Sequence, residues 1–194
     1  MTDTPTSASL LADRPLVYLE DLSVGDQFTS GEHAMDEAQI INFATQFDPQ
    51  PFHLDDTAAR ATLFGGLAAS GWHTAAITMR LQVTSGLPIA GGIVGAGGEL
   101  SWPRPTRPTD VLHVVSEVLQ MAPSKSKPDR GMVTVRSETR NQHGDVLQTS
   151  TVRIVVRRRP QAMPATTAAT AAATTAATAA APAATTDDAA RGAT

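Results

Sequence analysis

The residues best suited to chemistry in this chain are Asp48 and His53, which are separated by five positions and stand around Pro49 and Pro51. In a regular helix that spacing would turn the two side chains about 140° apart. The prolines argue against a regular helix here and predict a stiff, extended turn that can aim both side chains at one point. A carboxylate can take a proton from water, and an imidazole can orient or reprotonate that water near neutral pH. The alternative is structural: Asp48 caps a turn, and His53 starts the next helix.

A second candidate group is Gly71, which follows Ser70 at the expected start of a helix. The first amides of a helix have no intrahelical partner and carry partial positive charge. Because glycine has no side chain, a carbonyl oxygen could approach the Gly71 N–H closely. That arrangement suits a thioester whose oxygen gains negative charge during a reaction. The alternative is an ordinary Ser70 N-cap followed by a closely packed glycine.

Three segments before residue 87 are predicted to be helical. Segment 36–47 has apolar residues at helical spacing, with Asp36 and Gln39 placed to form a capping box. Segment 54–62 is expected to be a short surface helix. Segment 70–85 is apolar over most of its circumference, which is typical of a helix buried in the middle of a domain.

Alternating apolar and polar residues predict strands elsewhere. The expected strands are 26–35, 91–102, 110–121, 131–141 and 146–157, and the turn residues 141–145 join the last two as a hairpin. The order of strand, helices and then several strands predicts the α+β class, with an antiparallel sheet packed on a buried helix.

Composition limits the remaining possibilities. Residues 1–15 and the Ala/Thr-rich residues 161–194 are expected to be disordered, because they cannot bury enough apolar area to order themselves. Residues 16–160 are then a single domain. The chain has no cysteine, which excludes disulfides and thiolate chemistry, and its net charge of −4 argues against a nucleic-acid partner. With neither a signal peptide nor an apolar run of roughly 18 residues, we expect a cytoplasmic protein that does not span a membrane.

The stretch from Phe47 to Met79 resembles the hydratase motif of MaoC-like proteins. That motif places an aspartate, four further residues and a histidine before a short helix and a glycine-bearing segment that leads into the central helix. Where many members have Asn-Pro, this chain has Gln50-Pro51, and where many have a histidine before the glycine, it has Ser70. The resemblance also covers the segments 18–26, 141–145 and 157–160.

The resemblance implies a hot-dog fold, in which a curved antiparallel sheet wraps around a central buried helix. It also implies a homodimer or higher homo-oligomer with an acyl-CoA tunnel at the subunit interface. By analogy, Asp48 and His53 activate water for addition to an enoyl thioester, and the Gly71 amide binds the thioester oxygen. The implied activity is that of an (R)-specific enoyl-CoA hydratase or acyl dehydratase that needs no metal or redox cofactor, since coenzyme A is part of the substrate. Two alternatives share the fold: an acyl-CoA thioesterase, and a non-catalytic subunit that binds an acyl thioester.

Overall fold

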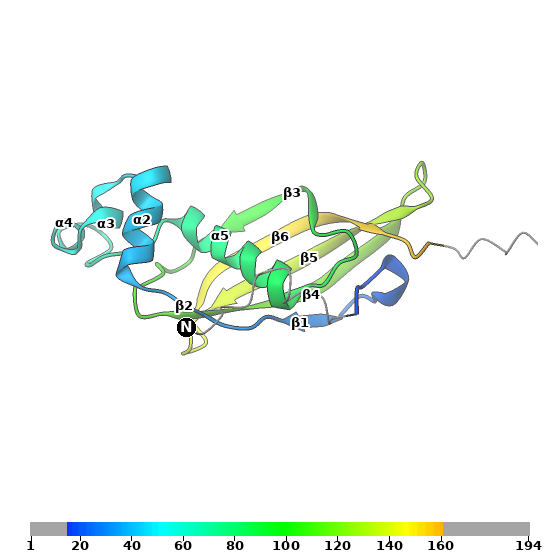
Figure 1. The fold of residues 1–194 in the computed structure, drawn as a ribbon, viewed down its shortest axis with the longest axis horizontal. Helices are drawn as coiled ribbons and strands as arrows, with labels where there is room; N and C mark the ends of the chain where they lie inside the picture. Colours follow the sequence, from blue (N-terminus) through cyan, green and yellow to red (C-terminus); the bar gives the residue numbers. More distant parts are fainter. Residues whose placement is uncertain (1–14, 161–194) are drawn as a thin grey trace, which may run out of the picture. The chain divides into compact units, whose positions relative to one another are not determined.

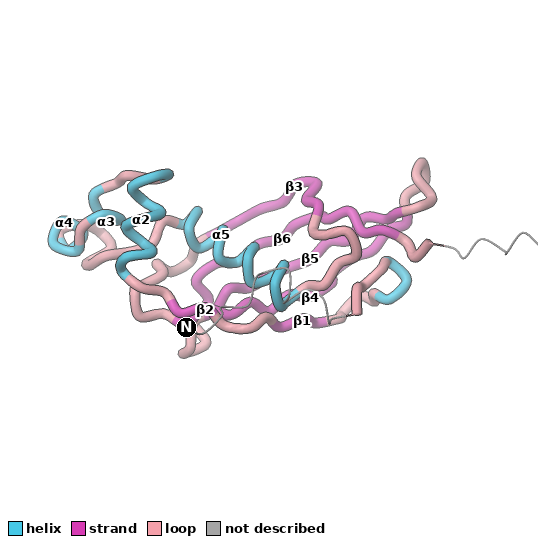
Figure 2. Tube along the Cα trace, in the orientation of Figure 1, coloured by secondary structure: helices cyan, strands magenta, loops and turns pink. Residues whose placement is uncertain are grey.

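The computed structural model describes residues 15–160, in which a six-stranded sheet carries one long helix across its face (Figures 1 and 2). The predicted disordered ends lie outside the described residues, apart from Pro15. The elements in chain order are η1 (Leu19–Asp21), β1 (Gln27–Thr29), β2 (His33–Ala34), α2 (Glu37–Phe47), α3 (Pro51–Leu54), α4 (Asp56–Arg60), α5 (Gly71–Leu81), η2 (Gln82–Gly86), β3 (Val94–Ser101), β4 (Val111–Pro123), β5 (Arg130–Arg140) and β6 (Val146–Arg157).

All strand pairs in the sheet are antiparallel, in the order β1-β4-β5-β6-β3, and β2 also pairs with β4. The hairpin between β5 and β6 turns where predicted. Asn141 Oδ1 accepts the backbone N–H groups of His143 and Asp145, each at 3.0 Å, and Gly144 has a φ of 81° that suits glycine. This sheet and the helix α5 that lies on it confirm the α+β class and the hot-dog fold.

The predicted strand 26–35 is wrong in its continuity, because it divides into β1 and β2. Ser30 causes the break. Its hydroxyl accepts the Val114 N–H at 2.9 Å, so a side chain takes the place of a backbone acceptor in the ladder with β4. A serine that bonds to nearby backbone in this way competes with regular strand pairing.

The first helix forms as predicted, with Asp36 accepting the Gln39 N–H at 2.8 Å at the start of α2. The predicted helix 54–62 forms only in part, as α4, and a separate short helix, α3, ends at Leu54. Asp55 separates them, because its backbone is extended and its side chain accepts the Ala58 N–H at 2.7 Å. Aspartate is a strong N-cap, and in this position it starts a new helix instead of continuing the old one.

Helix α5 begins at Gly71 as predicted, but it is not buried on all sides within one chain. Trp72 is 63% exposed and Met79 is 48% exposed. The inward side of α5, continued into η2, carries polar groups at a spacing of four residues, at Thr74, Thr78 and Gln82. Their hydrogen bonds are Thr74 Oγ1 to Thr106 Oγ1 (2.9 Å), Thr78 Oγ1 to Thr139 Oγ1 (2.6 Å) and Gln82 Nε2 to Ser137 Oγ (2.8 Å).

Two apolar clusters accompany these polar contacts in the core. One contains Leu19, Leu22, Leu87, Ile89, Val118, Val133, Val135, Ile154 and Val156. The other contains Met35, Ile40, Leu67, Ala69, Ile77, Leu81, Leu112, Val114 and Leu147. The core between α5 and the sheet therefore combines apolar packing, which supplies most of the stabilisation, with directional hydrogen bonds. Within residues 15–160, no helix has the length and apolar content needed to cross a membrane.

Gly131 in β5 offers a test of this packing. A Cβ atom at Gly131 would lie 2.6 Å from Leu19 Cδ2 and 2.9 Å from the Ala122 carbonyl oxygen. We expect Gly131→Ala to lower the free energy of unfolding by about 1–3 kcal/mol in urea titrations, because the backbone at Ala122 must shift. Gly31→Ala is the control, since its Cβ would meet Ser85 Oγ at an ordinary 3.4 Å. Equal stabilities of the two variants would contradict the prediction.

Candidate active site

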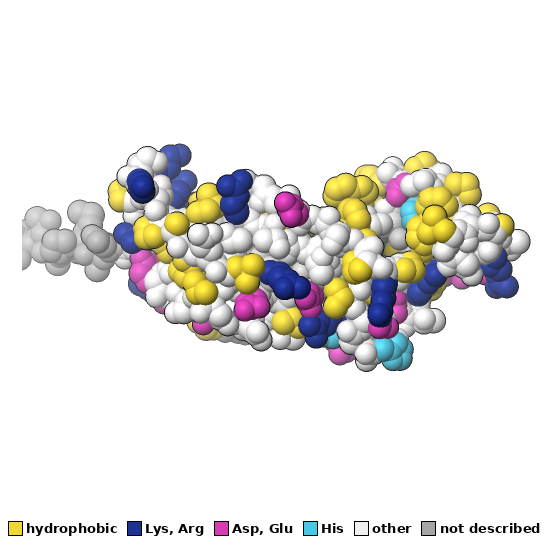
Figure 3. Space-filling view, turned by 180° about the vertical axis from the view of Figure 1, so that it is seen from behind, with side chains coloured by type: hydrophobic (Ala, Val, Ile, Leu, Met, Phe, Trp, Pro, Cys, Tyr) yellow, Lys and Arg dark blue, Asp and Glu magenta, His cyan; other side chains and the backbone are white. Residues whose placement is uncertain are grey.

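The three residues singled out in the sequence, Asp48, His53 and Gly71, meet at one cavity of about 500 Å³ beside the start of α5. The cavity is also lined by Gln50, Phe52, Leu63, Phe64, Ala69, Ser70, Trp72, Thr74, Trp102, Pro103, Arg104, Pro105 and Thr106. Hydrophobic side chains gather at the end of the domain that carries α2, α3 and α4 on the face seen in Figure 3. The ionisable side chains of Asp48 and His53 therefore face a cavity whose lining is mostly apolar.

Asp48 directly follows α2, and its backbone N–H still bonds to the Ala44 carbonyl oxygen at 2.9 Å. Its Oδ2 accepts the Ser70 hydroxyl at 2.6 Å, and its Oδ1 accepts the Gln50 amide at 2.7 Å. Burial alone would raise the pKa of Asp48, but these two hydrogen bonds and the nearby His53 ring outweigh it, so the pKa lies below its usual value. Asp48 is therefore a carboxylate at neutral pH.

His53 lies on α3, and this corrects the expected extended turn. Gln50 is extended as predicted, with φ −86° and ψ 142°, but Pro51 then starts a helix. Proline at the first helical position loses no hydrogen bond and has a φ that suits the helix. The turn from Asp48 to Gln50 and the first residues of α3 together bring the imidazole beside the carboxylate.

The His53 ring is held in one tautomer. Its Nδ1 lies 2.7 Å from the Ala68 carbonyl oxygen, which can only accept, so Nδ1 carries the hydrogen. In the neutral ring, Nε2 is then an acceptor, and it faces Asp48 Oδ2 at 3.5 Å. Two acceptors at that separation suit a water molecule or a hydroxyl that donates toward both of them.

Gly71 is the first residue of α5, so its N–H has no intrahelical partner and lies at the positive end of the helix. The structure also gives a second reason for glycine at this position. A Cβ atom would lie 2.8 Å from the ring atoms Cδ2 and Cε2 of Trp102. The indole of Trp102 is fixed in turn by its Nε1 donating to Gln148 Oε1 at 2.8 Å.

The structural role considered for Ser70 is also observed: it caps a helix in addition to lining the cavity. Ser70 is the N-cap of α5, because its hydroxyl oxygen accepts the Trp72 N–H at 3.2 Å, and the same hydroxyl donates to Asp48. Sequence reasoning identified this cap but missed its bond to the carboxylate. Trp102 contacts Gly71 and Gln148, which are distant in sequence, so no short-range pattern predicts its role at the cavity.

His73 lies on α5 but does not line this cavity. Its ring stacks on Phe43 at 4.6 Å between centroids, and its buried Nδ1 has no hydrogen-bond partner among the described residues. Burial is the main reason that the pKa of His73 lies below its usual value, so the ring is neutral at pH 7. Within residues 15–160, no group of three or more His, Cys, Asp or Glu side chains is arranged to hold a metal ion.

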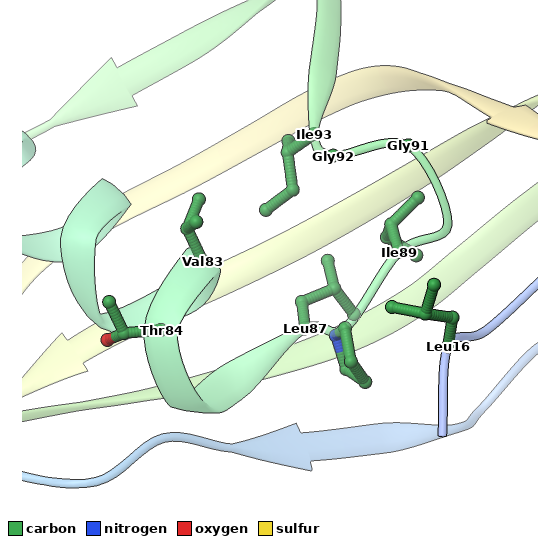
Figure 4. Close-up of a pocket in the computed structure, with 9 residues that line it drawn as sticks. Leu16, Val83, Thr84, Leu87, Ile89, Gly91, Gly92 and Ile93 are labelled. Atoms are coloured by element: carbon green, nitrogen blue, oxygen red, sulfur yellow. The ribbon is translucent and has the colours of Figure 1, made fainter. Parts of the chain in front are cut away.

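A second cavity, of about 170 Å³, lies at the other end of the long helix, between η2 and the loop that leads to β3 (Figure 4). It is lined by Leu16, Val83, Thr84, Leu87, Pro88, Ile89, Gly91, Gly92 and Ile93. No ionisable side chain is among them, so this cavity lacks the groups needed for acid–base chemistry.

Comparison with known proteins agrees with the fold. The family description of the MaoC-like domain matches residues 22–141. The chain is 66% identical to the MaoC-like dehydratase from Rhodospirillum rubrum, over 74% of this chain and 99% of that one, with a TM-score of 0.73. It is 26% identical to the R-hydratase PhaJ1 from Pseudomonas aeruginosa, over 74% of this chain and 88% of that one, with a TM-score of 0.60. It is also 32% identical over 127 residues to the uncharacterized protein YdeM of Bacillus subtilis, a match that spans 64% of this chain and 87% of YdeM.

The Ser70–Asp48 hydrogen bond predicts a pH effect. The folded chain keeps Asp48 charged to lower pH than the unfolded chain does, so Asp48 stabilises the fold above its unfolded pKa, and this stabilisation is lost as the pH falls through the folded pKa. We expect Ser70→Ala to raise the pKa of Asp48 in a ¹³C carboxyl NMR titration. At neutral pH it should also lower the free energy of unfolding by about 0.5–2 kcal/mol, because the N-cap is lost.

Gln50→Ala is the matched comparison, because it removes the other donor to the Asp48 carboxylate and leaves the N-cap of α5 intact. It should raise the pKa of Asp48 by less than Ser70→Ala does, since the hydrogen bond from Ser70 is the stronger influence. A larger rise in Gln50→Ala would contradict this account of the site.

Proposed function

The chain belongs to the MaoC-like domain family, a family of hydratases and dehydratases, and from that premise we propose that it interconverts an enoyl thioester and a 3-hydroxyacyl thioester. The substrate is proposed to be CoA-linked and the product to have (R) configuration, as in an (R)-specific enoyl-CoA hydratase. One observation carries the proposal: the charged Asp48 and the acceptor Nε2 of His53 face each other across 3.5 Å in the same cavity as Gly71.

In the hydration direction, a water molecule donates to Asp48 and to His53 Nε2. Its oxygen attacks C3 of the enoyl thioester as one of its protons passes to this pair. The electrons of the C2=C3 bond move toward the thioester carbonyl, whose oxygen becomes negative. The Gly71 N–H, at the positive end of α5, stabilises that oxygen. His53 helps to return a proton to C2, so the elements of water are added across the double bond.

Asp48 and His53 have different roles in this scheme because their surroundings differ. Ser70 and Gln50 keep Asp48 ionised, so it can accept a hydrogen bond from water throughout the reaction. The Ala68 carbonyl keeps the proton of the neutral His53 ring on Nδ1, which leaves Nε2 free to accept and then release a proton. Adding water leaves no electrons to be passed to an acceptor, so the proposed reaction needs no redox cofactor, and the Gly71 N–H takes the role that a metal ion would have at the thioester oxygen.

The proposal is tested by following enoyl absorbance with crotonyl-CoA and with longer enoyl-CoAs. We expect Asp48→Asn and His53→Ala each to lower kcat by at least about a hundredfold, the usual contribution of an acid–base group. Asp55→Asn is the matched control, because Asp55 caps α4 outside the cavity and asparagine caps equally well. A near-normal rate in either cavity variant would contradict the assigned roles, and release of free thiol from acyl-CoA would favour the thioesterase.

We also propose that the working unit is a homodimer or a higher homo-oligomer of this chain. Strand β3 is exposed along its whole length at the edge of the sheet, and the outer side of α5 exposes Trp72 and Met79. An unpaired edge strand next to exposed apolar side chains is a surface that favours association. We expect sedimentation velocity at assay concentrations to show dimers or larger species. Activity from monomers alone would contradict this expectation, and activity only with a different chain would favour the non-catalytic subunit.

A further inference from the structure

The segment that leads into α5 supplies groups to both Asp48 and His53. Ala68 places its carbonyl oxygen against His53 Nδ1, and Ser70 places its hydroxyl against Asp48 Oδ2. Gly71 follows directly. Residues 62–70 that carry these groups are neither helix nor strand, and Gly65 and Gly66 have positive φ angles of 64° and 158°. The backbone of this segment therefore depends on other parts of the chain for hydrogen bonds.

Arg107, in the connection between β3 and β4, makes the largest number of these bonds. Its Nη1 donates to the carbonyl oxygens of Gly66 at 2.7 Å and Leu67 at 3.0 Å, and its Nη2 donates to the carbonyl oxygen of Phe64. One planar guanidinium thus binds three of the four carbonyl groups between Phe64 and Leu67 in an irregular segment. Lysine could not repeat this, because an ammonium on a flexible chain lacks the rigid fork of donors.

Arg107 is itself held firmly. Its backbone N–H donates to Oδ2 of the buried Asp110 at 2.7 Å, and the Asn141 amide donates to the other oxygen of Asp110 at 3.2 Å. The preceding residue, Thr106, accepts the Ala69 N–H at 2.9 Å. Contacts from this one connection therefore hold the backbone on both sides of Ala68.

We propose that Arg107 is a positioning residue: by fixing the carbonyl groups of Phe64, Gly66 and Leu67, it holds the Ala68 carbonyl where that carbonyl keeps the His53 proton on Nδ1. Without this constraint the Ala68 oxygen moves, and the neutral ring divides its proton between Nδ1 and Nε2. The Nε2–H form cannot accept a proton from water. The effect on catalysis rests on the proposed hydratase function, whereas the effect on the His53 tautomer does not.

The test compares Arg107→Lys with Arg60→Lys. Arg60 forms an exposed ion pair with Asp56 at 2.7 Å, and a lysine can keep that pair, so the Asp56 carboxylate that accepts the Leu67 N–H stays in place. In Arg107→Lys, ¹⁵N NMR of the imidazole should show a mixture of neutral tautomers in place of the single Nδ1–H form. We expect kcat for enoyl-CoA hydration to fall by about 10- to 100-fold, the scale of a displacement of about 1 Å at a reacting group, with KM changed much less. Arg60→Lys should match the parent protein in both measurements.

Each outcome of the test decides for or against the proposal. A pure Nδ1–H signal and a normal kcat in a less stable Arg107→Lys would show that Arg107 only stabilises the fold, and this would overturn the proposal. If the parent protein does not hydrate enoyl-CoA, the tautomer measurement still tests the role of Arg107, so the two failures are distinguishable.

If Arg107→Lys does not fold, Arg107→Ala is examined with millimolar guanidinium added. Return of the single tautomer with guanidinium but not with methylammonium supports the proposal, and equal behaviour with both ions overturns it.

Discussion

The hydrogen bond from His53 Nδ1 to the Ala68 carbonyl oxygen is the interaction on which the rest of the site depends. It decides which ring nitrogen can take up a proton, and only the nitrogen that faces Asp48 is useful there. Ala68 lies on an irregular segment, so its position is set by its N–H bond to the Phe52 carbonyl oxygen and by the contacts of Thr106 and Arg107 with its neighbours, and not by its own secondary structure. The reactivity of one imidazole is thus linked to the connection between two strands.

The segment that leads into α5 also contributes to a negative group and a positive group at the cavity, the Asp48 carboxylate and the N-terminus of α5. Asp48 accepts hydrogen bonds from Ser70 and Gln50, which keep it negative although it is partly buried. One residue beyond Ser70, Gly71 starts α5 and lines the cavity, and the N-terminus of the helix adds partial positive charge there. Ser70, which bonds to the carboxylate proposed to activate water, and Gly71, which is proposed to receive the developing negative charge, are therefore adjacent. Fixing both in advance avoids reorganisation during the reaction.

Local signals in the sequence were enough to predict most elements of the fold and to single out Asp48, His53 and Gly71, which the structure brings to one cavity. The capping pair Asp36 and Gln39, the period of two in the long strands and the Asp–His spacing are all short-range patterns. Predictions were wrong where a side chain replaced a backbone contact, as at Ser30, or where a cap restarted a helix, as at Asp55. The contacts of Arg107 and Trp102 could not be predicted, because they join residues distant in sequence whose partners are backbone atoms and a glycine.

The polar contacts between α5 and the layer beneath it have a consequence for how proteins of this kind can diverge. An interface made only of aliphatic side chains lets a helix slip or rotate by repacking. Here, sliding by one residue, about 1.5 Å, would break the hydrogen bonds from Thr74 to Thr106, from Thr78 to Thr139 and from Gln82 to Ser137, and bonds of this kind contribute about 0.5–1.5 kcal/mol each. The helix is thus locked in register. Mutations on its outward side, including Trp72 and Met79, can alter what the protein accommodates without displacing the amide at its beginning.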